Sequence, residues 1–228
     1  MRLLAIDTSG PVCAVGLRVD GEVTEAVHDE PRAHARVVLD LVRGLLRGAE
    51  VRLQDLDAIA FARGPGSFTG LRIAAGVTQG LAMGAGLPVI GVSSLAALAL
   101  AACREKSARR VLAALDARMG DVYWGAYERA GDRPLTVAVA DRISAPPDVA
   151  PPGPGGWLGA GSGFAQWPDL AGSAVTSRCP GILPRPADLL ELAAHAWTAG
   201  DVMDPADALP VYLRDRVARR SGESGHGR

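Results

Sequence analysis

Two different spacings of apolar residues alternate along the first hundred positions, and together they predict a mixed α/β fold. Short apolar runs predict strands, and two of these runs meet at Asp20-Gly21, a sequence typical of a hairpin turn. The predicted strands are Leu3–Ile6, Cys13–Val19, Glu22–His28, Ala58–Ala62 and Val89–Val92. Helical spacing predicts helices over about Ala33–Arg47, Ser67–Met83 and Ser93 or Ser94 to Cys103. Strands that alternate with helices indicate a sheet with a parallel part.

The same order of elements begins again after residue 106. An apolar strand predicted over Arg110–Leu115 ends in Asp116, as the first strand ends in Asp7, and a second predicted strand, Val122–Glu128, follows. We infer two related lobes: residues 1–105, and a less regular copy at 106–215 whose end is a candidate to return to the first lobe. A helix is expected over Ala187–Thr198. Residues 216–228 are rich in Gly, Ser and charge, and we expect them to be disordered.

Three glycines on one face mark the helix predicted after Ser67. Gly76, Gly80 and Gly84 are four residues apart, so they share a face. Each lowers helix stability by about 0.8–1 kcal/mol relative to Ala, so another backbone packed against the bare face is the expected compensation. That backbone belongs either to this chain or to a partner, and the sequence leaves both alternatives open.

Two glycine-rich turns are candidates for phosphate contacts. Gly64-Pro65-Gly66 precedes a helix whose start is capped by Ser67 or Thr69, and free N–H groups at a helix start bind anions. No Gly-Lys-Ser/Thr follows, so this is not a Walker loop, and a plain strand-to-helix turn is the simpler interpretation. The second turn, Leu158–Gly163, is likewise interpreted first as a loop beside a strand.

Composition excludes some classes of function. The chain has 228 residues, is 48% hydrophobic and has a formal net charge of −1, so it has no general attraction to nucleic acid. Any RNA role therefore depends on a local patch or on a partner. The arginine run at 214–220 is a candidate for phosphate contact, but terminal charge runs are more often solvated. Three widely separated cysteines favour reduced thiols, no apolar run reaches membrane-spanning length, and Asp7 comes too early for a secretory signal. We expect a cytoplasmic protein.

The familiar catalytic and metal-binding motifs are absent from the sequence. No two histidines stand at i, i+4, there is no Cys-x-x-Cys, and there is no Gly-x-Ser-x-Gly, so no metal site is expected. Asp7 and Asp116 are the most suggestive carboxylates, because at the end of a strand they can hold Mg²⁺ and a nucleotide phosphate between two lobes. The alternative is that each caps its own turn. His34, at a helix start, is more typical of a capping or surface residue than of a catalytic base.

Several motifs resemble those of the bacterial TsaB (YeaZ) family. The resemblance covers nearly the whole chain except its tail, and it is most specific in the Gly-Pro-Gly-Ser-Phe-Thr-Gly-Leu-Arg segment. The matching segments are Leu4–Ser9, Pro31–His34, Gly64–Arg72, Gly91–Leu95, Leu115–Tyr123, Trp167–Leu170 and Pro210–Arg214.

This resemblance implies an actin-like, sugar-kinase-like (ASKHA) ATPase fold with two RNase H-like lobes. It also implies membership of the complex that forms N6-threonylcarbamoyladenosine at position 37 of tRNAs reading ANN codons. The catalytic paralogue TsaD carries a metal-binding His-x-x-x-His, and the matching positions here are Ser94 and Leu98. Neither replaces an imidazole ligand. The resemblance therefore implies a non-catalytic scaffold subunit that binds and stabilises TsaD.

The resemblance further implies which surfaces and ligands to expect. The first two helices would dock on TsaD, or pair with a second copy when TsaD is missing, with TsaE as a further partner and tRNA bound only through the complex. Residues predicted for this interface are Val38, Leu41, Leu71, Ala74, Ala75, Gly76, Thr78, Gln79 and Gly80. No cofactor is expected to bind tightly, and weak ATP or ADP binding at the cleft or the partner interface would involve Asp7, Thr8, Ser9, Asp116, Gly159 and Gly161.

Two further hypotheses belong to the enzyme class. A stand-alone ATP-dependent phosphotransferase of the actin-like fold would use Asp7 and Asp116, but the sequence supplies no second positioned base. A peptidase acting on the paralogue is a weaker hypothesis, because no nucleophile–base pair is found.

Overall fold

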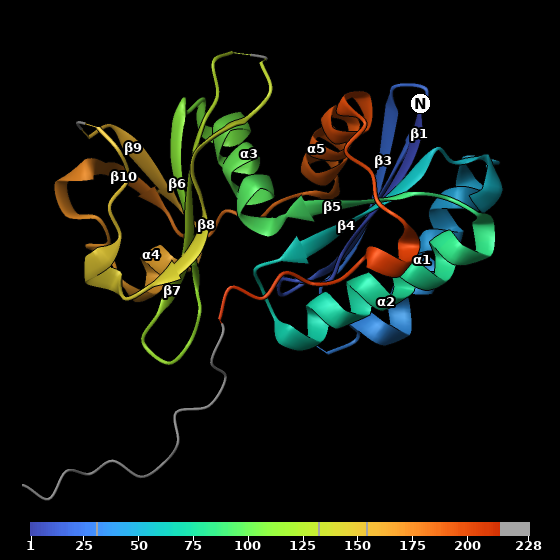
Figure 1. Ribbon diagram of the computed structural model, residues 1–228, viewed down its shortest axis with the longest axis horizontal. Helices are drawn as coiled ribbons and strands as arrows, with labels where there is room; N and C mark the ends of the chain where they lie inside the picture. The colour runs from blue at the N-terminus through green and yellow to red at the C-terminus, as the bar shows by residue number, and fades with distance from the viewer. Residues whose placement is uncertain (31, 132, 154, 215–228) are drawn as a thin grey trace, which may run out of the picture.

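The computed structural model in Figure 1 describes residues 1–30, 32–131, 133–153 and 155–214. The strands are β1 (Arg2–Asp7), β2 (Cys13–Val19), β3 (Glu22–His28), β4 (Ala58–Gly64), β5 (Val89–Ser93), β6 (Arg110–Asp116), β7 (Val122–Glu128), β8 (Thr136–Ser144), β9 (Trp157–Ala160) and β10 (Val175–Cys179). The α-helices are α1 (His34–Gly48), α2 (Phe68–Ala85), α3 (Ser94–Lys106), α4 (Gly163–Gln166) and α5 (Pro186–Ala199). Short 3-10 turns occur at Leu53–Asp55, Pro146–Asp148, Gly172–Ala174 and Pro205–Asp207.

The strands form two five-stranded sheets with the same topology. The first has the order β3-β2-β1-β4-β5, in which β1, β2 and β3 are an antiparallel meander and β4 and β5 are parallel to β1. The second has the order β10-β9-β6-β7-β8, with β6, β7 and β8 antiparallel and β9 and β10 parallel to β6. Each strand of the first sheet thus has a counterpart in the second.

Both faces of the first sheet are covered, and the alternation of side chains in β1 shows how. Leu4 and Ile6 point into a core shared with α1 and α2, whereas Leu3 and Ala5 point into a second core shared with α5. All four side chains are almost completely buried, because consecutive residues of a strand face opposite sides. This explains why β1 is apolar throughout, as is typical of strands in sheets covered on both faces.

Two helices cross between the lobes. Helix α3 follows the last strand of the first sheet, yet its Leu95 and Leu98 pack in a core with Val111 of β6. Helix α5 follows the last strand of the second sheet, yet its Leu189 packs against strands of the first sheet. Figure 1 shows α3 beside β6 and α5 beside the first sheet. The crossing joins the lobes into one body with a cleft between them.

The fold-class prediction is confirmed: two related lobes, the second less regular. A single 3-10 turn over Pro146–Asp148 occupies the place between β8 and β9 that α1 has between β3 and β4, and α4 is four residues long against eighteen for α2. The lobe boundaries at 105 and 215 stay predictions. The predicted disordered tail, 216–228, lies outside the described residues, as does all of the arginine run after Arg214.

None of the described helices is both long enough and apolar enough to cross a lipid bilayer.

Candidate functional site: the interlobe cleft and the exposed face of the second helix

A cavity of about 1130 Å³ lies in the cleft between the lobes. Asp7 at the end of β1 and Asp116 at the end of β6 both line it, together with Ser9 and Ser162. The prediction that the two carboxylates face one cleft is therefore consistent with the topology, since β1 and β6 are counterparts in the two sheets. Their role toward Mg²⁺ or nucleotide stays a prediction.

Asp7 is held by its own turn. The backbone N–H and the hydroxyl of Ser9 both donate to Asp7 Oδ1, at 2.8 and 2.6 Å, and Ser94 Oγ lies 3.2 Å from Ser9 Oγ. Burial raises the pKa of Asp7, although the Ser9 hydrogen bonds and the nearby His34 act in the opposite direction. His34 itself lies 3.2 Å, through Nε2, from the carbonyl oxygen of Gly10.

Asp116 is also engaged locally. Its Oδ1 accepts from the backbone N–H of Arg118 at 2.7 Å, and its Oδ2 forms an ion pair with the Arg118 guanidinium at 3.2 Å. Arg214 ties the same turn to the end of the described chain, because it pairs with Asp121 at 2.8 Å and donates to the carbonyls of Ala117 and Arg118. These contacts favour the turn-capping interpretation of both aspartates.

Three predicted nucleotide contacts do not line the cavity. Thr8 is fully buried, and its hydroxyl donates to the carbonyl oxygen of Gly70 at 2.7 Å. A Cβ on Gly159 would stand 2.5 Å from the Phe164 ring, and one on Gly161 would stand 2.5 Å from the Ala114 carbonyl oxygen. These residues pack within the chain, and their contact with a ligand in the cleft stays a prediction.

The two positions that match the metal ligands of the catalytic paralogue face the same cavity. Ser94 and Leu98 lie one turn apart on α3, and both line the cleft. Neither a hydroxyl nor an isobutyl group can replace an imidazole ligand at the positions that the family resemblance implies. Among residues 1–30, 32–131, 133–153 and 155–214, no group of three His, Cys, Asp or Glu side chains is placed to hold a metal ion.

The glycine stripe of α2 faces outward. Gly76, Gly80 and Gly84 are exposed, and a Cβ added to any of them would meet no other atom within 4 Å. Exposed Met83 (57%) lies beside Gly84 on α2, and exposed Leu39 (38%) lies on α1, which contacts α2. The sequence leaves open whether this face packs against the same chain or against a partner. In the described residues, no other part of the chain packs against it.

Five of the predicted interface side chains face the opposite way. Val38 on α1 and Leu71, Ala74, Ala75 and Thr78 on α2 are almost completely buried within the first lobe. Val38, Ala74 and Ala75 belong to the core under the two helices. Contact of these five residues with a partner stays a prediction. Leu41 and Gln79 are half-buried; Leu41 packs against that core, and Gln79 donates to the carbonyl oxygen of Ala206 at 3.3 Å.

An aromatic cluster at the rim of the cleft was not predicted. The rings of Phe68 and Tyr212 lie 5.7 Å apart, and the Arg72 guanidinium stands 3.7 Å from the centre of the Phe68 ring and donates to the Tyr212 hydroxyl at 3.1 Å. Phe68 and Tyr212 are about half exposed. No local pattern finds this cluster, since Tyr212 comes 140 residues after Arg72.

Comparisons with known proteins find relatives that match over nearly the whole chain. The family model described as TsaD, tRNA N6-adenosine threonylcarbamoyltransferase, matches residues 27–158. The tRNA threonylcarbamoyladenosine biosynthesis protein TsaB of Escherichia coli is 41% identical over 223 residues, with 96% of each chain covered. The protein of the same name from Haemophilus influenzae is 35% identical, with 95% of each covered. The solved structure of YeaZ from Pseudomonas aeruginosa superposes with a TM-score of 0.88 at 44% identity, covering 93% of this chain and 99% of that one.

Proposed function

The chain belongs to the TsaB (YeaZ) family, and from that premise we propose that it is a scaffold subunit of the complex that forms N6-threonylcarbamoyladenosine at position 37 of tRNAs reading ANN codons. In this role it binds and stabilises the catalytic paralogue TsaD and has no transferase activity alone. The complex works in the cytoplasm, with TsaE as a further partner.

The observation that carries the proposal is the bare stripe of Gly76, Gly80 and Gly84. An exposed helix with three interior glycines is about 2–3 kcal/mol less stable than one with alanines, and no atom of the described residues packs against the glycines to compensate for this. Without side chains on this stripe, a partner helix can approach at the short end of the range of about 8–10 Å between packed helix axes. Exposed Met83 at one end supplies apolar surface for the same contact.

The cleft supports a non-catalytic role. Both carboxylates are already bonded within their own turns, and the paralogue's two imidazole positions are Ser94 and Leu98. We propose that nucleotide binds weakly or not at all to the isolated chain. Calorimetric titration with Mg-ATP tests this: tight binding would favour the stand-alone phosphotransferase instead.

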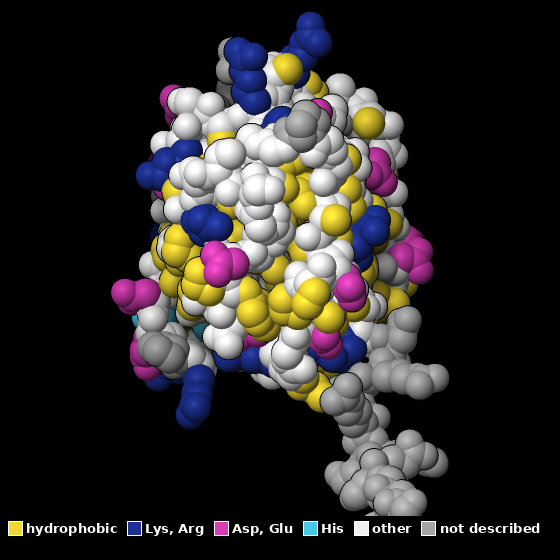
Figure 2. Space-filling model, turned by 90° about the vertical axis from the view of Figure 1, so that its left-hand side faces the viewer, with side chains coloured by type: hydrophobic (Ala, Val, Ile, Leu, Met, Phe, Trp, Pro, Cys, Tyr) yellow, Lys and Arg dark blue, Asp and Glu magenta, His cyan; other side chains and the backbone are white. Residues whose placement is uncertain are grey.

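The mixed surface charge of the chain supports the proposal that it contacts tRNA only as part of the complex. Figure 2 shows one end of the molecule, on which Lys and Arg side chains are interspersed with Asp and Glu. With a formal net charge of −1, the chain offers no general counterion effect for an RNA backbone.

The docking test is co-purification with TsaD. Gly80→Leu places a large side chain on the stripe and is expected to abolish co-purification, whereas folding is retained because a side chain at Gly80 points into open space. Gly181→Leu is the matched control: this glycine is also open, has no positive φ and lies in the second lobe. Unchanged co-purification of Gly80→Leu would refute docking through the stripe. Without TsaD, the same variant is expected to weaken a homodimer.

A further inference from the structure

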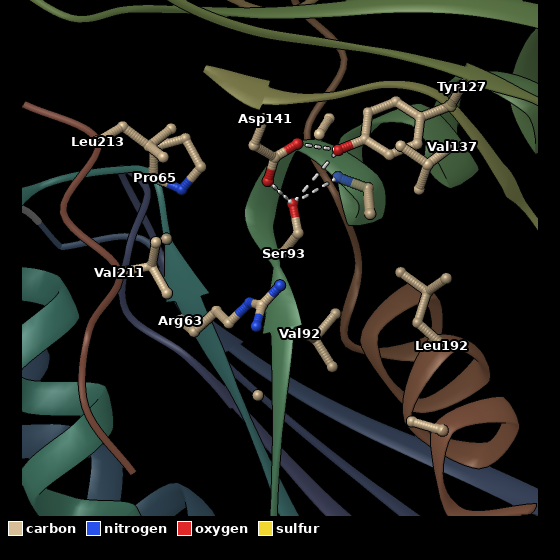
Figure 3. Close-up of a pocket in the computed structure, with 15 residues that line it drawn as sticks. Arg63, Pro65, Val92, Ser93, Tyr127, Val137, Asp141, Leu192, Val211 and Leu213 are labelled. Carbon is tan, nitrogen blue, oxygen red and sulfur yellow. Dashed lines mark hydrogen bonds between the residues drawn. The ribbon is translucent and has the colours of Figure 1, made fainter. Parts of the chain in front are cut away.

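A second cavity lies between the lobes, next to the cleft, with which it shares Pro65, Val211 and Leu213. Its volume of about 390 Å³ falls within the range of about 300–1,000 Å³ that is typical of small-molecule sites. Figure 3 shows that its walls come from the ends of β4 and β5, from β7 and β8 of the second sheet, and from α5. It is not part of the helical face proposed for docking.

One end of the cavity carries a fixed carboxylate. The Tyr127 hydroxyl donates to Asp141 Oδ1, and the Ser93 hydroxyl donates to Asp141 Oδ2 at 2.5 Å (Figure 3). Burial, and next the Asp141 charge, raise the pKa of Tyr127, so this phenol stays a proton donor. A Cβ on Gly125 would stand 2.8 Å from Asp141 Oδ1, so the glycine makes room for the carboxylate. Each carboxylate oxygen can accept a further hydrogen bond.

Arg63 brings a cation to the same cavity. Figure 3 shows Arg63 extending from β4 toward the middle of the cavity, below Ser93. Its stem lies across Gly91, where a Cβ would stand 3.1 Å from Arg63 Cδ. Within the part of the chain that the structure describes, the Arg63 guanidinium has no hydrogen bond and no ion pair, so its donors are free for a ligand.

Opposite charges therefore face one cavity without pairing to each other. Apolar side chains also line it: Val92, Val137, Leu192, Ala196 and Leu213. A ligand that matches this arrangement is neutral overall, carries one anion and one cation close together, and has a small apolar body. We propose that the cavity binds a free aliphatic α-amino acid. Arg63 takes its carboxylate, Asp141 takes its ammonium group, and its side chain packs against Val137 and Leu192. Charge-assisted hydrogen bonds to the ligand's carboxylate and to its ammonium group give the site its specificity.

Isothermal titration calorimetry of the isolated full chain with L-leucine tests the proposal. Saturable binding is expected below about 10 mM, with a rise in the unfolding temperature at the same concentrations. Two analogues that keep one charge each, 4-methylpentanoate and 3-methylbutylamine, are expected to bind at least about tenfold more weakly, because each leaves one charged group of the protein unpaired.

Two variants locate the site. Arg63→Met keeps an apolar stem and is expected to weaken L-leucine binding at least about tenfold, and Asp141→Asn to weaken it as well. Arg142→Met is the control: it removes an exposed charge from the neighbouring residue, over the Trp124 ring, and should leave binding unchanged. Absence of binding by the wild-type chain would overturn the proposal. So would unaltered binding by Arg63→Met, or equal binding of 4-methylpentanoate, which would make this an anion site.

Discussion

Thr8 and Gly70 approach each other so closely that a side chain at residue 70 has no room. A Cβ on Gly70 would stand 1.9 Å from the Thr8 carbonyl oxygen, and the Thr8 hydroxyl donates to the Gly70 carbonyl oxygen at 2.7 Å. Gly66 is similar, with a would-be Cβ 2.7 Å from the carbonyl oxygen of Ser9. The glycines of this family motif thus seat the start of α2 directly on the turn after β1.

Gly70→Ala is therefore expected to destabilise the chain by at least about 2 kcal/mol, because the backbone of Thr8 must move to admit a methyl group. Urea unfolding followed by circular dichroism measures the change in the free energy of unfolding. Gly76→Ala is the control in the same helix, where the added methyl meets open space. It is expected to stabilise the isolated chain by up to about 1 kcal/mol. Equal effects of the two substitutions would contradict this account of the motif.

Much of the first lobe can be predicted from periodicity alone. The strands there are apolar runs with turn residues at their ends, such as Asp20-Gly21, and the helix α1 has a clear apolar stripe. Each local preference agrees with the final structure, so the predicted bounds lie close to those observed. The duplication can likewise be predicted from the sequence, because Asp7 and Asp116 each end the first strand of a lobe.

The orientation of α2 could not be predicted, because the helix is small or apolar on nearly every side. Its buried face consists of Leu71, Ala74, Ala75, Thr78 and Ala82, and its exposed face includes the glycines. After Arg72 its polar residues are Thr78, which is buried, and the neighbouring Gln79, so periodicity alone does not choose between the two faces. Because of this ambiguity, the residues predicted for the interface include Leu71 and Ala74, which lie on the buried face.

Part of the second lobe could not be predicted from the sequence, because it depends on contacts between residues far apart in the chain. Trp157–Ala160 forms β9, although its neighbourhood resembles a glycine-rich turn. Gly159 is required there because the Phe164 ring occupies the space of its side chain. The Asp141 carboxylate accepts from Ser93, which lies 48 residues earlier in the sequence. The second cavity therefore could not be predicted from local sequence patterns.

The pH dependence of the free energy of unfolding should differ between the wild type and a variant with a neutral side chain in place of Asp7. Because burial raises the pKa of Asp7 above its unfolded value, the unfolded state releases this proton first as pH rises. Stability from this group is therefore full below the unfolded pKa near 3.8 and is lost as pH rises through the folded pKa. Asp7→Asn keeps an acceptor for Ser9 and should gain stability relative to wild type as pH rises from 3.5 to 7, measured by urea unfolding at each pH. A constant difference across this range would contradict the raised pKa.

Alkaline titration should single out Tyr127 among the three tyrosines. Burial, and next the Asp141 charge, raise its pKa, so the folded chain keeps this proton after the unfolded chain has lost it. The stability that Tyr127 contributes therefore falls as pH rises above the unfolded value of 10. In absorbance at 295 nm, one phenol is expected to ionise only when the chain unfolds. Tyr127→Phe should remove that delayed component, and Tyr212→Phe, at an exposed position, should retain it.

An ion pair joins the two crossing helices, α3 and α5. Its loss should lower the free energy of unfolding of both lobes together. Asp188 of α5 is 1% exposed; it accepts from the Arg185 backbone N–H at 2.7 Å and forms an ion pair with Arg104 of α3. Asp188→Ala leaves both donors without this acceptor. Arg104 is about one-third exposed, so water compensates in part, and we expect a loss of about 2–3 kcal/mol in the free energy of unfolding.

Glu191 supplies the matched control for this prediction, because it lies one turn further along α5 and pairs with Arg129 at 2.6 Å, but is 40% exposed. Glu191→Ala is expected to lose less than Asp188→Ala, because the Glu191 carboxylate is partly exposed, although the Arg129 side chain is only 16% exposed. Since α3 packs on one sheet and α5 on the other, the Asp188 variant should unfold in a single transition that is shifted as a whole. A separate early transition of one lobe, or equal losses for the two variants, would show that this pair does not couple the lobes.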